Sequence, residues 1–163
     1  MQKQAYQDEL TSVKNVAAYD KKVYDLNQKI SAGQAAFAVV MVDLNQLKEV
    51  NDRFGHEKGN IALQTLCRAV CRLYKHSPVY RIGGDEFVVI LEGEDYDNRD
   101  ALFQKVQAFE RIRDLKAAQP WTQLAASVGM AVYDQTCDAT YQAVFNRADA
   151  RMYEQKQHLA PRT

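Results

Sequence analysis

The chain has 163 residues, of which 47% are hydrophobic and 26% charged, as is usual for a globular protein with one core. Its 21 basic and 21 acidic residues give a net charge of zero, which argues against a surface for duplex nucleic acid or anionic membrane. Three cysteines, an odd number, do not suit a disulfide framework and favour a reducing cytoplasmic setting. The longest apolar run, residues 35–42, is too short to span a bilayer. We therefore expect a single domain over residues 1–163, without nucleic-acid or membrane contact.

The first half of the chain predicts helices around one strongly apolar strand. Apolar residues recur at helical spacing from Asp8 to about Ile30, so one face of a helix should pack on the core. Residues 35–44 are almost continuously apolar, which is typical of a central strand covered on both faces. A short helix within 45–55 and a long helix over 57–75 are expected to follow.

The second half predicts a hairpin, a helix, a strand and a last helix. The hairpin follows Pro78 and runs to Leu91, and residues 93–97 read as an acidic loop. Asn98 is expected to cap the next helix, whose apolar face carries Leu102, Val106, Phe109 and Ile112. Residues 124–133 predict a strand and 140–157 a final helix. This order indicates an α/β (α+β) fold with a mixed central sheet flanked by helices.

The turn of the hairpin carries two carboxylates, Asp85 and Glu86, at the mouth of a hydrophobic strand. Such a pair costs desolvation free energy unless a cation or hydrogen-bond donors compensate it. The arrangement suits a divalent metal held over a phosphate, although a solvated hairpin is an equally open interpretation. Asp43 ends the apolar strand, and if the two strands are neighbours, Asp43 and Asp85 converge on one Mg²⁺ site.

Residues Gly83 to Phe87 spell the motif that names the GGDEF family, the diguanylate cyclases. Further segments resemble that family in its own order: 8–15, 42–56, 126–129 and 148–156. The resemblance implies a palm-like fold shared with class III nucleotide cyclases and polymerases. It implies a homodimer that condenses two GTP molecules into cyclic di-GMP and two pyrophosphates, with Mg²⁺ or Mn²⁺ as cofactor. It also implies that the domain belongs to a longer signalling protein with an N-terminal sensory domain.

The resemblance assigns roles to residues of this chain. Asp43, Asp85 and Glu86 would be catalytic and would hold the metal together with the carbonyl of Leu44. The substrate would be bound by a larger set of residues that hold its phosphates, its base or its pocket walls: Gln46, Leu47, Lys48, Lys156, Gly83, Gly84, Asn51, Asn60, Leu10 and Leu63. From the residues alone, solvated surface positions are the more common role for such lysines, and a core role for the leucines is at least as open as a pocket role.

The chain departs from the family pattern at three places. Asn60 stands where an aspartate usually faces guanine, so we hypothesise a weaker preference for GTP, with cyclic AMP-GMP as a possible product. Ala160 stands where an arginine often reaches the phosphates, and Arg162 is a candidate replacement. Residues 74–77 lack the arginine and aspartate of the inhibitory product site, so we expect no strong product inhibition there. A non-catalytic module that binds GTP to regulate a neighbour, and a purely structural dimerisation module, are the competing hypotheses.

Overall fold

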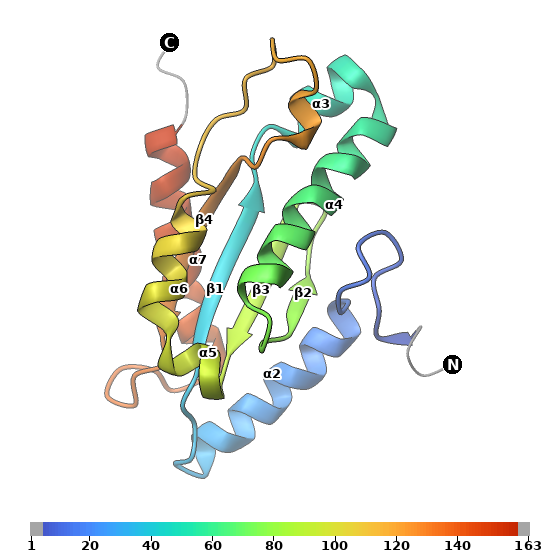
Figure 1. Cartoon of the computed structure of the whole chain (residues 1–163). Helices are drawn as coiled ribbons and strands as arrows, with labels where there is room; N and C mark the ends of the chain where they lie inside the picture. The colour runs from blue at the N-terminus through green and yellow to red at the C-terminus, as the bar shows by residue number, and fades with distance from the viewer. Residues whose placement is uncertain (1–4, 160–163) are drawn as a thin grey trace.

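A four-stranded sheet forms the centre of the computed structural model, which describes residues 5–159 (Figure 1). The spatial order is β2-β3-β1-β4, and all three strand pairings are antiparallel. The expected α+β class is therefore confirmed, but the sheet is not mixed, because parallel pairing is confined to two isolated bridges. The strands are β1 (Ala38–Leu44), β2 (Val79–Arg81), β3 (Glu86–Leu91) and β4 (Ala126–Val132).

Helices cover both faces of the sheet. Alternate side chains of β1 point to opposite faces, so Val40 and Val42 join one buried cluster while Val39 and Met41 join the other. The first cluster includes residues of α4 and α6, and the second includes residues of α2 and α7. The helices are α2 (Val16–Ser31), α3 (Leu47–Phe54), α4 (His56–Leu73), α5 (Gly93–Asp97), α6 (Arg99–Gln107) and α7 (Tyr141–Leu159), with a 3₁₀ turn η1 (Pro120–Thr122).

Helix α2 begins at Val16, so the expected helical start at Asp8 is wrong. The Asp8 carboxylate accepts hydrogen bonds from the Thr11 amide at 3.0 Å and the Thr11 hydroxyl at 2.6 Å, which closes a turn. Asn15 then caps the helix, because its side-chain oxygen accepts from the Ala18 amide at 3.1 Å. The preceding residues pack as a separate N-terminal segment beside β2.

The region after the hairpin also differs from the sequence-based expectation. Residues 93–97 form the short helix α5 and are not a loop. Helix α6 ends at Gln107, so Phe109 and Ile112 lie outside it, and the carbonyl of Phe109 accepts instead from the Ala126 amide of β4 at 3.0 Å. Asn98 occupies the N-cap position, but its side chain makes no capping bond and donates to the Glu94 carbonyl.

Gly129 of β4 sets how closely α7 approaches the sheet. A Cβ at this position would lie 2.4 Å from the Ala148 carbonyl oxygen and 2.5 Å from the Met152 nitrogen. The missing side chain therefore lets the α7 backbone pack directly against β4.

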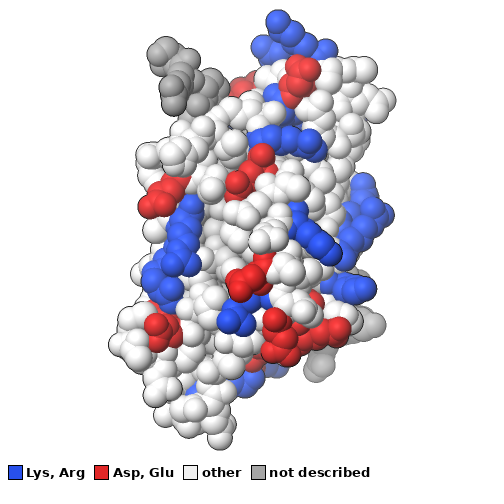
Figure 2. Space-filling model, turned by 60° about the vertical axis from the view of Figure 1, so that its left-hand side comes forward, with Lys and Arg blue, Asp and Glu red and all other residues white. Residues whose placement is uncertain are grey.

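The exterior carries both signs of charge. Figure 2 shows basic and acidic side chains intermingled on one face, in keeping with the zero net charge. Within residues 5–159, the helices are too short or too polar to cross a membrane.

Candidate functional site

Three carboxylates meet where β1 and β3 come together at one end of the sheet. The antiparallel register sets Asp43 opposite Glu86, and the Leu44 amide donates to the Asp85 carbonyl at 2.9 Å. One oxygen from each of Asp43, Asp85 and Glu86 lies within 4.8 Å of the other two. Asp43 and Asp85, which were predicted from the sequence to converge, are thus neighbours.

Asp43 is the most deeply buried of the three, with 1% of its surface exposed. Asp43 points to the same face of β1 as Val39 and Met41, which is the face covered by α7. There its Oδ2 pairs with the Lys156 ammonium group. The other oxygen, Oδ1, is buried without a hydrogen-bond partner among the described residues. A buried acceptor left unsatisfied in this way is costly, so the site favours an additional cation or donor.

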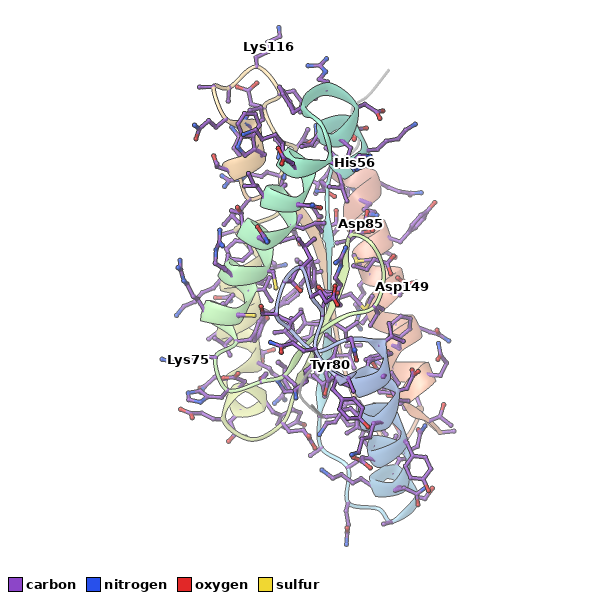
Figure 3. All side chains as sticks on the ribbon, turned by 90° about the vertical axis from the view of Figure 1, so that its right-hand side faces the viewer. His56, Lys75, Tyr80, Asp85, Lys116 and Asp149 are labelled. Carbon is purple, nitrogen blue, oxygen red and sulfur yellow. The ribbon has the colours of Figure 1, made fainter. Side chains whose placement is uncertain are left out.

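The pKa values in the cluster follow from burial and mutual repulsion. Burial raises the pKa of Asp43 to about 7, against the Lys156 hydrogen bond, and the charge of Asp85 adds to the rise. Burial, then the charges of Asp85 and Asp149, raise the pKa of Glu86; Asp149 of α7 is labelled with Asp85 in Figure 3. Burial of the Lys156 ammonium group opposes its charge, but Asp43 and the other carboxylates outweigh burial and raise the pKa of Lys156.

The cluster fits a hard divalent cation. It offers only carboxylate oxygens, which Mg²⁺ and Mn²⁺ prefer, and the unpartnered Oδ1 of Asp43 is available to one. Lys156 already places one positive charge against the same carboxylate. The residues of the cluster are therefore compatible with a metal ion.

A hollow of about 520 Å³ opens beside the acidic cluster. It brings together six of the predicted site residues: Leu44, Gln46, Leu47, Lys48, Asp85 and Lys156. The first intrahelical bond of α3 runs from the Val50 amide to the Gln46 carbonyl at 3.0 Å. The amides of residues 47–49 therefore have no acceptor within the helix, which makes the start of α3 a favourable place for an anion.

The remaining predicted residues do not line this hollow. Asn51 lies on α3 with its Oδ1 over Gly59, where a Cβ would come within 1.8 Å of it, and Asn60, the next residue of α4, is exposed. Leu63 belongs to the buried core, and Leu10 packs against that core. Gly83 and Gly84 are exposed at the hairpin tip, where the Gly84 carbonyl accepts from Arg81 at 2.9 Å.

Two residues that hold Asn45, at the edge of the hollow, were not predicted from the sequence. Arg113, only 2% exposed, donates to the Asn45 carbonyl, and the Asn45 side chain accepts from the Ser127 hydroxyl at 2.9 Å. Arg113 follows an apolar residue in a loop, and nothing in that spacing distinguishes it from a surface arginine. The polar Ser127 inside an otherwise apolar strand is the one local signal that could have pointed here.

Other predictions concern regions away from the hollow. Tyr74, Lys75 and Ser77 border a separate hollow of about 660 Å³ between the N-terminal segment and the α4–β2 connection. In this connection the His76 amide and the Ser77 hydroxyl donate to the buried Asp95, so they serve the fold. Ala160 and Arg162 lie outside the described residues.

The sequence of residues 5–161 matches the family model described as diguanylate cyclase, GGDEF domain. The chain belongs to the GGDEF diguanylate cyclase family. The acidic cluster and the start of α3 are therefore features of a GGDEF domain.

Similar proteins agree with this membership. The chain is 29% identical over 154 residues to the bifunctional diguanylate cyclase/cyclic di-GMP phosphodiesterase MucR of Pseudomonas aeruginosa, covering 93% of this chain and 22% of MucR. It is 30% identical over 161 residues to the diguanylate cyclase DgcP of Escherichia coli, covering 95% of this chain and 46% of DgcP. The solved GGDEF domain of TpbB from Pseudomonas aeruginosa superimposes with a TM-score of 0.74 at 26% identity, over 93% of this chain and 89% of that one. The chain thus spans less than half the length of these two curated relatives.

Proposed function

We propose that this GGDEF domain is a diguanylate cyclase that condenses two GTP molecules into cyclic di-GMP and two pyrophosphates. The observation that carries the proposal is the acidic cluster of Asp43, Asp85 and Glu86 beside the amides at the start of α3, which have no acceptor within the helix. Carboxylates for a metal and amides for an anion are the two parts that nucleotidyl transfer from a triphosphate requires. The named activities of MucR and DgcP support the same reaction.

One set of residues would bind the metal and another would bind the phosphates. Asp43, Asp85 and Glu86, with the Leu44 carbonyl, would hold Mg²⁺ or Mn²⁺, which neutralises the triphosphate and polarises its α-phosphorus. The amides at the start of α3, with Lys48 and Lys156, hold the β- and γ-phosphates. Oδ1 of Asp43, which has no hydrogen-bond partner among the described residues, would be the metal ligand, and Lys156, whose ammonium group pairs with Oδ2, would lie between this carboxylate and the phosphates.

The reaction requires two copies of the domain. The 3′-hydroxyl of each GTP attacks the α-phosphorus of the other; a phosphodiester bond forms, the bond to pyrophosphate breaks, and the hydroxyl proton passes to solvent. One subunit supplies one nucleotide, so the active form is a two-fold symmetric homodimer. Dilution below the dimerisation constant should lower the rate per mole of protein, and a rate per mole that stays constant on dilution would contradict this requirement.

The direct test measures cyclic dinucleotide formation from GTP and Mg²⁺ by chromatography for the wild type and Asp85→Ala. Asp149→Ala is the matched control, because Asp149 is an exposed acid near the cluster that lies outside the metal set. We expect turnover by the wild type and the control and none by Asp85→Ala. GTP binding by the wild type without any turnover would overturn the enzyme and favour the regulatory GTP-binding module.

A second candidate product, cyclic AMP-GMP, is favoured by Asn60. Its exposed side chain on α4, next in sequence to Gly59, is available to a nucleobase, and an amide both donates and accepts hydrogen bonds. An aspartate only accepts, which suits the donor edge of guanine better than the mixed edge of adenine. Incubation with equal GTP and ATP tests this, with Asn60→Asp as comparison: a wild-type product that contains guanine alone would refute relaxed selectivity.

A further inference from the structure

The turn between β1 and α3 is held in an unusual backbone conformation. Gln46 has a φ of +64°, in the left-handed region that non-glycine residues seldom adopt. Its side chain makes no capping bond to α3. Something outside the turn must therefore maintain this conformation.

Arg113 supplies that restraint through its backbone. The Arg113 amide donates to the Gln46 side-chain oxygen, and the Gln46 side-chain nitrogen donates to the Arg113 carbonyl at 3.2 Å. The Gln46 amide group is thus bound on both of its atoms by one residue of the segment between α6 and β4.

The Arg113 side chain also binds the Asn45–Gln46 turn. Its Nη1 donates to the Asn45 carbonyl at 2.7 Å and its Nη2 to the Gln123 carbonyl at 3.2 Å. Within residues 5–159 no carboxylate forms an ion pair with Arg113, and its Nε has no hydrogen-bond partner. Burying a guanidinium costs desolvation free energy, and hydrogen bonds to carbonyls alone return only part of it. We therefore ask which part of the protein the Arg113 side chain positions.

The same segment also contacts the other end of α3. Trp121 packs edge-on against Phe54, the last residue of α3, with ring centroids 5.3 Å apart, and the Lys58 ammonium lies 4.5 Å from the Trp121 ring centroid. Figure 1 shows this segment, in orange, beside α3, and Figure 3 labels Lys116 at its tip. Residues 109–125 therefore restrain α3 at both ends.

We propose that Arg113 is a positioning residue that keeps the Asn45–Gln46 turn fixed, so that the free amides at the start of α3 face the hollow for the triphosphate. The inference rests on the proposed function, because it concerns how the same site holds phosphates. Arg113 need not touch the nucleotide; it acts through Gln46 and Asn45.

A second explanation would be that Arg113 only adds positive charge beneath the hollow. Arg113→Lys separates the two, since lysine keeps the charge but lacks the planar fork that reaches two carbonyls. Gln46→Gly provides an independent test, because glycine adopts the left-handed conformation freely yet removes the link to the Arg113 backbone. Arg111→Lys is the matched control. Arg111 lies in the same segment and is exposed, and its side chain bonds the Leu124 carbonyl. Its contact with the Asn45 side chain runs through the backbone carbonyl, which the substitution keeps.

The experiment compares binding of a non-hydrolysable GTP analogue and of GMP, with Mg²⁺, and measures amide hydrogen exchange of residues 46–50 without nucleotide. For Arg113→Lys and Gln46→Gly we expect faster exchange and a loss of at least about tenfold in the preference for the triphosphate, with GMP affinity unchanged. Arg111→Lys should match the wild type in both measurements.

Three outcomes overturn the inference. If Arg113→Lys keeps the wild-type preference for the triphosphate analogue over GMP, the positive charge alone suffices. If its amide hydrogen exchange at residues 46–50 is unchanged, the turn does not need the planar guanidinium group. Equal losses for the analogue and GMP indicate general damage to the fold. A wild type that binds the analogue no better than GMP is a different result, because it removes the proposed function itself. If Arg113→Lys fails to fold, Gln46→Gly decides on the same readouts.

Discussion

The burial of Asp43 predicts that removing its charge stabilises the metal-free protein. In Asp43→Asn the amide keeps the side chain's size, removes one negative charge from a cluster of three, and offers a donor to Asp85 or Glu86. A hydrogen bond at the position of Oδ1 should gain about 1–3 kcal/mol. Losing the ion pair should cost about 0–1 kcal/mol, because the Lys156 ammonium group is half-exposed and can be hydrated, although Asp43 itself is buried. A net gain of about 1 kcal/mol corresponds to a rise of about 2–4 °C in Tm for a domain of this size.

Thermal unfolding in EDTA at pH 8, and again with excess Mg²⁺, measures the effect. We expect Asp43→Asn to melt above the wild type in EDTA and to lose the increase in Tm that Mg²⁺ gives the wild type. Asp149→Asn, an exposed neighbour, should change the free energy of unfolding by less than about 0.5 kcal/mol. A lower Tm for Asp43→Asn in EDTA would refute the reasoning and make Asp43 a structural partner of Lys156.

The same residue fixes the sign of the pH dependence. The pKa of Asp43 is raised from 3.8 to about 7, so the folded state binds this proton more tightly than the unfolded state. The resulting stabilisation is complete below pH 3.8 and is lost as the pH rises through 7. The advantage of Asp43→Asn should therefore shrink as the pH falls below 7; an advantage that grows on acidification would contradict the assigned direction.

Three further predictions concern the metal, the packing of α7 and a thiol. Protons compete with the metal for Asp43 and Glu86, so Mn²⁺ affinity measured by calorimetry should fall below pH 7, and a pH-independent affinity would contradict this. Gly129→Ala should lower the free energy of unfolding by about 1–3 kcal/mol in urea titration, because the new Cβ overlaps the α7 backbone; Gly84→Ala, with open space around it, is the control, and equal effects would refute the packing argument. The hydrogen bond with Cys67 lowers the pKa of Cys71, so iodoacetamide at pH 7 should label Cys71 before the more exposed Cys137, and mass spectrometry showing the reverse order would contradict it.

The centre of the fold could be predicted from the sequence because its signals are local. The uninterrupted apolar run before Asp43 indicates a strand covered on both faces, and β1 is buried along its whole length. The two glycines before Asp85 indicate the turn that returns the chain beside β1. Since both acids sit at strand ends, their convergence follows once the strands are neighbours.

Other features depend on contacts that no local pattern reveals. Residues 93–97 are acidic and contain a glycine, which predicts a loop. Asp95 is nevertheless buried and accepts bonds from His76 and Ser77, and these bonds fix α5 against the connection between α4 and β2. Arg113 likewise resembles a surface residue in the sequence. One of its acceptors, Asn45, is far away along the chain, and the other, Gln123, belongs to no recognisable motif. The observed start of α2 differs from the predicted one for a related reason. The Asp8 carboxylate accepts a hydrogen bond from Thr11 in a turn and pairs with Arg81, so it does not begin a helix.

The most direct test of the account is the position of a divalent ion in crystals grown with Mn²⁺ and a non-hydrolysable GTP analogue, located by anomalous scattering. The account predicts an anomalous peak bonded to carboxylate oxygens of both Asp43 and Asp85, with the analogue's phosphates over the start of α3. A fully bound analogue whose metal touches neither carboxylate would contradict it.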